Sequence, residues 1–409
     1  MSLSTQPYKG ARDFYPEDKR LQKWMFGKMR EVVERFGYEE YDAPILEPLE
    51  LYLSKTSEEI VNQQTYSFED RGGRKVTLRP EMTPTVSRMV AAKRQELAYP
   101  LRWYSIPNVW RYERPQKGRL REHWQLNVDL FGVEGISAEV EMIQVADMLL
   151  KKFGATPEMY EIRVNSRKSL GKQVEAAGVK SSVAETIRVI DNFEKLSEAE
   201  FKKKLGEHVK EPGELYSYLT SDGDSKEVID LIKACNELGI NVVSKPSLAR
   251  GFDYYTDVVF EVFDKHPENN RSMFGGGRYD GLVGLFGVDP VPTVGFGMGD
   301  VTLQEFLRGH GLLPSFKSET DAYVVLIGDV ANEAQSVISQ LRAAGLNVAV
   351  DLSGRGADKQ IKTALKKGIN YVVFIGEQEL TSGELNVKNL ATGDEQRQTV
   401  DQIVSTIKN

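Results

Sequence analysis

The chain has one cysteine among its 409 residues, and this scarcity excludes several classes of protein. Cys235 alone cannot form an internal disulfide framework or a multi-cysteine zinc site. The four histidines show no metal-ligand spacing, so we expect no metal ion held by a protein motif. No apolar run approaches the roughly 18 residues of a membrane span, and the polar start lacks a signal-peptide core. These absences favour a cytoplasmic protein with no membrane partner.

An excess of basic charge is also missing. The chain carries 53 Lys and Arg against 60 Asp and Glu, which gives a net charge of −7. A general polyanion binder would be strongly basic, so that class is disfavoured, whereas a nucleic-acid enzyme with a local basic patch is compatible with these numbers. Neither an HExxH motif nor a Ser-His-Asp order is present, which disfavours zinc and serine hydrolases.

Two glycine-rich segments, Gly275–Gly281 and Gly295–Gly299, do not match the usual nucleotide-binding motifs. Neither fits GxGxxG, because Asp300 stands where a third glycine would be, and neither fits GxxxxGK[ST]. A dinucleotide fold and a Walker-type site are therefore disfavoured. We expect these glycines to let the backbone approach a flat ligand closely.

The length allows two or three domains, and 40% apolar and 28% charged residues are ordinary for a globular protein. Helical spacing of apolar residues predicts a helix over Glu17–Phe36. A strand is predicted near Lys75–Arg79, followed by Thr83 as an N-cap with proline at the first helical position. Between Ser105 and Gly132, two strand-like runs flank a polar loop and predict a long antiparallel hairpin.

The texture of the sequence changes at about residue 166, where Lys, Glu and Ser begin to dominate. Three amphipathic helices are predicted there, at Ser181–Phe193, Glu198–Leu205 and Lys226–Leu238. Strand-like sequence returns at Arg250–Phe263. We therefore predict a helical insertion at 166–245 that interrupts one sheet domain formed by residues 1–165 and 246–318.

The C-terminal part follows a linker candidate at Leu312–Asp321. From Ala322 to Gly376, strand and helix patterns alternate in the order β-α-β-α-β. This alternation predicts a small α/β domain with a mostly parallel sheet, over residues 319–409.

Polar residues alternate along the second strand of the predicted hairpin. Gln125, Asn127 and Asp129 fall on one face by the period of two, and this face is either exposed or part of a site. The loop Arg111–Arg121 holds five basic residues. Since guanidinium groups match phosphate oxygens bidentately, the loop is either a solvated surface segment or a phosphate clamp.

Two further segments combine polar groups in unusual ways. Glu81 and Thr83 stand at a strand-to-helix junction, where they could bind an ammonium group or simply stabilise the first turn of the helix. In Leu248–Asp257, Arg250 and Asp253 stand beside two tyrosines. This blend indicates either an edge strand with paired charges or a site.

Taken together, these segments resemble class II histidyl-tRNA synthetases. The matching runs are Lys9–Pro16, Leu78–Thr83, Arg111–Arg121, Arg250–Tyr255 and Gly276–Leu282. The last two are specific to the histidine enzyme and its close relatives. The resemblance covers nearly the whole chain. It implies an α+β catalytic domain on an antiparallel sheet of six or more strands, a helical insertion and a C-terminal α/β anticodon-binding domain. It also implies a homodimer, with Tyr38–Leu51 similar to the dimer-forming motif 1.

The resemblance also implies a reaction in two steps. ATP and L-histidine give histidyl-adenylate and pyrophosphate, and the histidyl group then moves to the 3′ end of tRNA(His). ATP is a substrate accompanied by Mg²⁺, and no organic cofactor is implied. The implied catalytic residues are Arg111 and Arg250. The implied histidine-binding residues are Glu81, Met82, Thr83, Arg111, Gln125, Asp129, Arg250, Tyr254, Tyr255 and Tyr279. Arg111, Glu113 and Arg119 would bind ATP, and Gln116 and Arg121 would reach the tRNA acceptor end.

The sequence departs from the family pattern at two positions. Asp129 stands where the family usually has Glu, and Thr302 stands where an arginine of motif 3 clamps ATP; Arg114 or Arg119 could serve in its place. The alternative interpretation is a catalytically reduced paralogue that acts as a regulatory subunit in histidine biosynthesis. Such paralogues typically lack the C-terminal domain and erode the Arg250–Tyr255 run, whereas this chain keeps both. A class II synthetase for another amino acid is disfavoured by the two histidine-type motifs.

Overall fold

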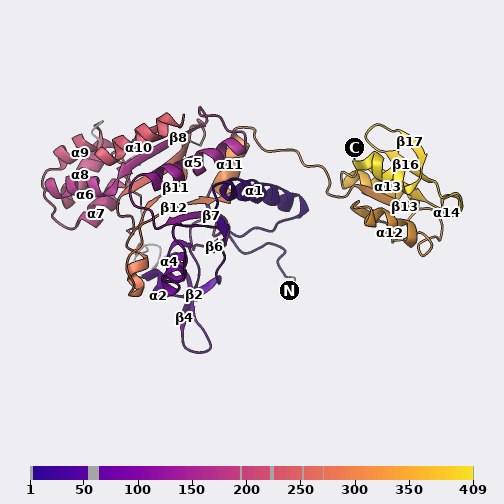
Figure 1. The fold of residues 1–409 in the computed structure, drawn as a ribbon, viewed down its shortest axis with the longest axis horizontal. Coiled ribbons are helices and arrows are strands. Elements are labelled where there is room, and N and C mark those ends of the chain that lie inside the picture. The colour runs from indigo at the N-terminus through magenta and orange to yellow at the C-terminus, as the bar shows by residue number, and fades with distance from the viewer. Residues whose placement is uncertain are drawn as a thin grey trace. The chain divides into compact units, whose positions relative to one another are not determined.

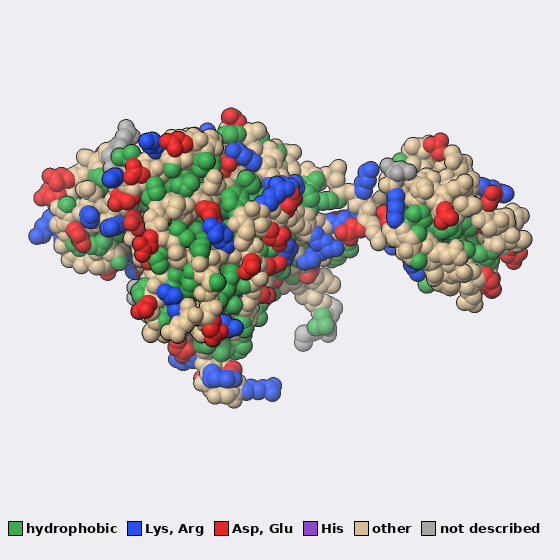
Figure 2. All heavy atoms as spheres, in the orientation of Figure 1, with side chains coloured by type: hydrophobic (Ala, Val, Ile, Leu, Met, Phe, Trp, Pro, Cys, Tyr) green, Lys and Arg blue, Asp and Glu red, His purple; other side chains and the backbone are tan. Residues whose placement is uncertain are grey.

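The computed structural model describes residues 3–53, 64–193, 196–221, 225–250, 253–269 and 271–408. The chain forms two units, Met1–Leu313 and Pro314–Asn409, each with its own hydrophobic core (Figure 1). Lys and Arg side chains are interspersed with Asp and Glu on the face shown in Figure 2, as the small net charge leads one to expect. Within the described ranges, no helix is long and apolar enough to cross a membrane.

The first unit is built on a large mixed sheet. Nine strands of the described chain form it, in the order β1-β5-β7-β12-β11-β10-β8-β9, with β6 paired to β7 beside this path. Neighbours are antiparallel except for β1 with β5 and β8 with β9. The strands are β1 (Glu39–Glu40), β5 (Leu101–Ser105), β6 (Asn108–Trp110), β7 (Glu122–Phe131), β8 (Tyr160–Ser166), β9 (Val242–Ser244), β10 (Val258–Asp264), β11 (Arg271–Arg278) and β12 (Thr293–Gly299). An antiparallel sheet of six or more strands was predicted, and the observed sheet confirms it apart from the two parallel pairs at its ends.

Four helices share one apolar core with the sheet: α1 (Pro16–Arg35), α5 (Ser137–Lys152), α10 (Lys226–Glu237) and α11 (Asp300–Gly309). The predicted helix over Glu17–Phe36 is confirmed as α1, which begins with proline in its first turn and buries Met25 and Met29. On β7, Leu126 and Val128 point into this core. The opposite face of β7 is therefore the one that carries Gln125, Asn127 and Asp129.

A small three-stranded sheet precedes the long hairpin. Its strands are β2 (Leu46–Pro48), β3 (Tyr66–Glu69) and β4 (Lys75–Leu78), and the helices beside it are α2 (Glu50–Leu53) and α4 (Thr83–Ala92). A short 3-10 turn, η2 (Val283–Phe286), packs against α4. Met82 is the N-cap of α4, so Thr83 is the first helical residue and the prediction of Thr83 as the cap was wrong by one position.

A helical module follows β8. Its helices are α6 (Arg167–Ala176), α7 (Val183–Ile190), α8 (Glu198–His208) and α9 (Pro212–Leu219), which lie together at one end of the first unit (Figure 1). They share a separate core that includes Leu170, Ile187 and Phe201. Further along the chain, α10 and β9 pack onto the large sheet instead. The separate helical core is thus formed by residues between 167 and 219, together with Ala249.

The structure corrects two strand predictions. The first strand of the predicted hairpin is broken into β5 and β6 and ends at Trp110, so Arg111 and Glu113 lie in an irregular loop and share no strand face. The predicted strand over Arg250–Phe263 begins only at Val258. Arg250 has φ +56°, which is incompatible with a strand. Gly251 and Phe252 of this run lie outside the described residues.

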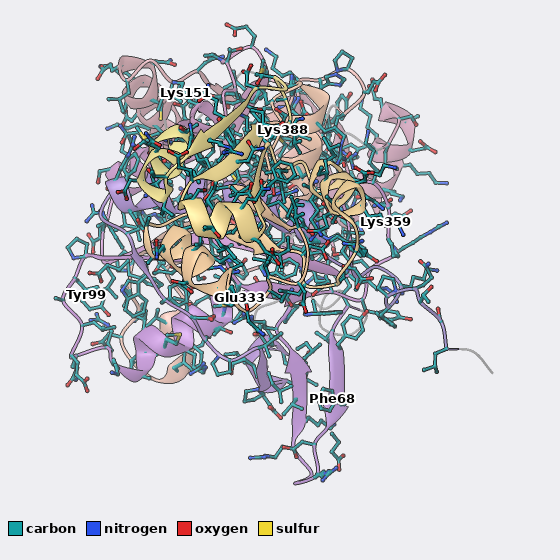
Figure 3. All side chains as sticks on the ribbon, turned by 90° about the vertical axis from the view of Figure 1, so that its right-hand side faces the viewer. Phe68, Tyr99, Lys151, Glu333, Lys359 and Lys388 are labelled. Atoms are coloured by element: carbon teal, nitrogen blue, oxygen red, sulfur yellow. The ribbon has the colours of Figure 1, made fainter. Side chains whose placement is uncertain are left out.

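The second unit is a five-stranded sheet in the order β14-β13-β15-β16-β17. Its strands are β13 (Ala322–Leu326), β14 (Val348–Val350), β15 (Tyr371–Ile375), β16 (Leu385–Asn389) and β17 (Glu395–Gln398), and its helices are α12 (Gln335–Ala343), α13 (Ala357–Lys366), α14 (Glu377–Ser382) and α15 (Val400–Lys408). The predicted β-α-β-α-β alternation is confirmed as β13 to β15, all parallel. The antiparallel pair β16–β17 extends it, with Lys388 paired to Glu395 at 3.1 Å (Figure 3).

Candidate active site

Four glycines form a flat floor on the sheet face opposite the helices. Gly275 pairs with Gly297, and Gly277 pairs with Gly295, across β11 and β12. A Cβ at Gly277 would lie 2.5 Å from the carbonyl oxygen of Val258, and one at Gly295 would lie 2.7 Å from that of Val128. At these two positions an added Cβ would meet backbone, so only glycine fits there. That a ligand approaches this backbone closely stays a prediction.

Polar side chains line both edges of this floor. On the β7 side, Asn127 and Asp129 are buried, so the polar face predicted for this strand is not a solvent-facing surface. On the β10 side, Glu261 pairs with Gly275 and accepts a hydrogen bond of 2.9 Å from Arg250 Nη1. A Cβ on Gly275 would collide with this guanidinium, so Arg250 lies directly on the floor.

The glycine floor and the polar side chains along its edges form a slot. Three tyrosines line one end of this slot and connect two buried carboxyl groups. The Tyr254 hydroxyl donates to Glu81 Oε2 at 3.1 Å, and the Tyr279 hydroxyl donates to Asp129 Oδ1. The ring of Tyr254 lies 4.8 Å from that of Tyr255 and 5.7 Å from that of Tyr279. Burial raises the pKa of all three phenols above the ordinary value, so the hydroxyls stay protonated and can donate.

Asp129 is the most perturbed carboxyl group of the slot. Burial raises its pKa to about 7, and the hydrogen bond from Tyr279 opposes this rise. Asp129 Oδ2, Gln125 Oε1 and Arg250 Nε are buried and have no hydrogen-bond partner in the part of the chain that the structure describes. A buried polar atom without a partner costs about 1–3 kcal/mol. Three such atoms around one glycine floor therefore indicate a polar ligand.

The opposite end of the slot carries Arg111 and His123. Arg111 Nε donates to the carbonyl of Pro80 at 2.9 Å, and no ion pair with a carboxylate engages Arg111 among the described residues. His123 continues the polar row of β7, two residues before Gln125, and our sequence analysis missed it although the same alternation reaches it. Burial and the charges of Arg111 and Arg12 lower the pKa of His123 to about 3, so its ring is neutral.

The position of the missing motif 3 arginine lies at this end. A Cβ on Gly299 would lie 3.5 Å from Thr302 Oγ1 and 3.9 Å from His123 Cδ2. The nearby cation Arg12 pairs with Asp300 at 2.8 Å, and its guanidinium lies over Phe14 and Trp124. Arg12 is thus engaged by Asp300 and two aromatic rings, and its charge also reaches His123.

The loop between β6 and β7 holds the remaining predicted residues. Gln116 and Arg119 form a bridge at its tip, and Arg119 lies 3.8 Å from Glu113 Oε2. Arg121 does not lie at the tip: its Nη1 donates to the Tyr8 hydroxyl at 3.0 Å, and its guanidinium lies 4.0 Å from the ring centre of Tyr112.

The structure thus brings most of the predicted histidine-binding residues together. These are Glu81, Arg111, Gln125, Asp129, Arg250, Tyr254, Tyr255 and Tyr279, with Thr83 beside Tyr254. Met82 is fully buried at the start of α4. No group of three or more His, Cys, Asp or Glu side chains that could hold a metal ion occurs within the described ranges.

The large sheet, the glycine floor and the two arginines define a class II aminoacyl-tRNA synthetase, the class that the motifs resemble. A family model described as histidyl-tRNA synthetase matches residues 10–212 and 166–301 in two overlapping stretches, and one described as an anticodon binding domain matches residues 321–409. The chain therefore belongs to the histidyl-tRNA synthetase family.

Curated relatives extend over almost the full chain. A histidine–tRNA ligase of Leptospira biflexa is 41% identical, over 99% of this chain and 98% of that protein. The histidine–tRNA ligase of Haloarcula marismortui is 39% identical, over 95% of this chain and 94% of its own, and that of Thermoplasma volcanium is 37% identical over 98% of both.

Solved structures share the fold. The crystal structure of histidyl-tRNA synthetase from Nostoc has a TM-score of 0.80 at 24% identity and covers 100% of this chain and 99% of that chain. A structure from Bacillus halodurans, described as an ATP phosphoribosyltransferase regulatory subunit/histidyl-tRNA synthetase, has a TM-score of 0.74 at 23% identity and covers 92% of this chain and 100% of that chain. The predicted fold class is confirmed. The regulatory alternative gains no better support, because the full-length relatives named above are histidine–tRNA ligases.

Proposed function

We propose that this chain activates L-histidine with ATP in the glycine-floored slot and then transfers the histidyl group to the 3′ end of tRNA(His). The observation that carries this proposal is the position of the Arg250 guanidinium. It lies on the glycine floor, between Asp129 at one end and Arg111 at the other. A histidine–tRNA ligase needs a slot that holds an amino acid and the α-phosphate of ATP side by side.

Histidine would lie with its ring at the tyrosine end. Glu81, Thr83 and Gln125 supply one anion and two neutral acceptors for the three donors of the α-ammonium group. Asp129 would accept the imidazole N–H, while the protonated hydroxyl of Tyr255 would donate to the other ring nitrogen. Tyr254 and Tyr279 would line the pocket, with Met82 packed beneath it.

ATP would occupy the other end, with its α-phosphate between Arg111 and Arg250. When the histidine carboxylate oxygen attacks the α-phosphorus, negative charge grows on the phosphoryl oxygens and pyrophosphate leaves. Two fixed guanidinium groups stabilise that charge more than the charge of the ground state. Glu113 and Arg119 would contact ATP from the loop, and Mg²⁺ would enter with the triphosphate as part of the substrate.

The tRNA would be bound at two places. Gln116, which forms a bridge with Arg119 at the loop tip, would contact the acceptor end. The resemblance also assigns Arg121 to the acceptor end, and its bonds to Tyr8 and Glu113 suit it to hold the base of that loop. The second unit, which the anticodon-binding model matches, would bind the anticodon. We propose domain limits close to those that the composition indicates: a catalytic core at 1–165 and 246–318, an insertion at 166–245 and an anticodon domain at 319–409.

We propose a homodimer that works in the cytoplasm. The segment similar to motif 1 exposes Ile45 and Leu46, and strand β3 at the other edge of the small sheet exposes Phe68 (Figure 3). Exposed apolar side chains that gather on one small sheet are typical of a surface covered by another subunit.

Replacement of Arg250 tests the proposed chemistry. Arg250→Ala should lower histidine-dependent ATP–pyrophosphate exchange by about 100- to 1000-fold, the usual loss for one transition-state donor, with a much smaller change in the KM for histidine. Arg308→Ala is the matched control, since Arg308 pairs with Glu305 on the surface of α11. Near-normal exchange by Arg250→Ala would remove Arg250 from the catalytic role.

A further inference from the structure

The loop that carries Arg250 is held by the start of the helical module. Arg167, the first residue of α6, directs one nitrogen at two successive carbonyl groups: Nη1 donates to Ala249 O at 3.0 Å and to Arg250 O at 2.8 Å. The Arg167 side chain is buried. A buried guanidinium that bonds two adjacent backbone oxygens fixes the orientation of the peptide between them.

That orientation matters because the backbone of Arg250 is strained. Arg250 has φ +56°, and among the described residues it is the one non-glycine residue with a positive φ. The left-handed conformation is unfavourable for an L-residue with a side chain and persists only where surrounding contacts impose it. The two bonds from Arg167 are contacts of this kind.

Neighbouring residues of the same junction hold both ends of the loop. Asn165 Nδ2 donates to Pro246 O at 2.9 Å and to Leu248 O at 2.8 Å, and the Ser166 hydroxyl donates to Asp257 Oδ1 at 2.8 Å. On α7, Arg188 Nη2 donates to Asp253 Oδ2 at 2.7 Å. The loop is thus tied to the end of β8 and to two helices of the module.

We propose that Arg167 is a positioning residue for Arg250. By holding the carbonyls of Ala249 and Arg250, it imposes the left-handed backbone that lays the Arg250 guanidinium on Gly275 beside Glu261. Contacts between the first helix of the module and the loop that carries Arg250 then influence the rate of histidine activation. This inference rests on the catalytic role proposed above for Arg250.

The first test is Arg167→Met, which keeps bulk and removes the donors. Displacement of a catalytic group by about 1 Å costs up to about 100-fold, so we expect kcat for pyrophosphate exchange to fall by about 10- to 100-fold. The KM for histidine should change far less than kcat, because Arg250 is proposed to act in the transition state and Asp129 and Tyr279 stand on other elements. Lys180→Met is the matched control: Lys180 Nζ also donates to a carbonyl, that of Gly206 at 2.6 Å, but within the module. An unchanged kcat in Arg167→Met would overturn the proposal.

A double-mutant cycle separates positioning from general stability. If Arg167 acts through Arg250, Arg167→Met should lower exchange by less than about twofold in an Arg250→Ala background, because the group it positions is gone. Losses that multiply in the double variant would overturn the proposal. Normal exchange by Arg250→Ala alone would instead refute the proposed role of Arg250, so the two failures are distinguishable.

A second variant covers a failure of Arg167→Met to fold, which thermal unfolding would reveal. Arg167→Lys keeps the charge but loses the planar fork, so it should fold and give a kcat between those of the wild type and Arg250→Ala. Two results would contradict the proposal. One is a folded Arg167→Lys single variant with wild-type kcat. The other is a loss of kcat from Arg167→Lys that is equally large in the Arg250→Ala background.

Discussion

At the scale of single residues, we expect Asp129 to set the pH dependence of histidine binding. Its pKa is about 7 because burial penalises the charged form, so the carboxylate is populated above pH 7 and lost as the pH falls. Free imidazole also protonates, near pH 6.5. The log of kcat/KM for histidine should therefore fall below pH 6 with a slope that approaches two.

Asp129→Asn should raise the KM for histidine strongly and reduce this slope to about one, since only the substrate then titrates. The measurement is pyrophosphate exchange at subsaturating histidine from pH 5.5 to 8.5. A variant that keeps both the wild-type KM and the wild-type slope would show that this shortened carboxylate does not reach the ring. Recognition would then fall to Tyr255 and Tyr254.

Gly297 offers a second test at this scale. A Cβ there would collide with the Gln125 amide and lie 3.4 Å from Asn127 Oδ1, both flexible side-chain groups rather than backbone. Gly297→Ala should therefore fold but displace Gln125 from the ammonium subsite. One hydrogen bond to a charged group contributes about 1.5–3 kcal/mol, so the KM for histidine should rise by about 10- to 150-fold. Gly281→Ala is the control, because a Cβ there meets open space. Equal KM values for the two variants would contradict the account.

The sequence predicted many residues of the candidate site. It could not predict features that depend on contacts made only in the folded chain. The period of two along β7 placed Gln125 and Asp129 on one face. The same alternation reaches His123, whose lowered pKa comes mainly from burial, with the charges of Arg111 and Arg12 adding to it. The left-handed backbone of Arg250 was not predictable, because contacts with Arg167 impose it against the local preference.

At the scale of elements, helices and strands with a strong hydrophobic period were predicted correctly. The pairing of strands distant in sequence could not be predicted from that period. The helix α1 and the alternation from β13 to β15 agree with their patterns. In the insertion, the three predicted helices correspond to α7, α8 and α10, whereas α6 and α9 were not predicted. The hairpin broke at Pro107, which has no N–H to donate to a ladder. The order of strands in the large sheet depends on contacts that no local pattern encodes.

The loop between β6 and β7 should separate the two steps of the reaction. Gln116→Ala should lower kcat/KM for tRNA charging by about 2- to 12-fold, the value of one hydrogen bond, and leave pyrophosphate exchange unchanged. Arg121→Ala should impair both steps, because Arg121 braces the loop base through Tyr8 and Tyr112. Equal loss of exchange and charging in Gln116→Ala would mean that the loop tip serves ATP instead.

At the scale of the whole molecule, the chain has two units with different features. The first contains the glycine-floored slot, and the second matches the anticodon-binding model. The net charge of −7 gave no hint of tRNA, and the interspersed charges in Figure 2 explain why: any attraction for a polyanion has to be local. The family motifs predicted the first unit, and the alternation of strand and helix patterns from Ala322 to Gly376 predicted the second.

The central claim is that this slot activates histidine and no other amino acid. The most direct measurement is ATP–pyrophosphate exchange by the purified full chain with each of the twenty amino acids. A pocket built on hydrogen bonds to imidazole rejects apolar isosteres by about 10⁴–10⁵, so exchange should occur with histidine alone. Silence with histidine, or comparable exchange with another amino acid, would contradict the account.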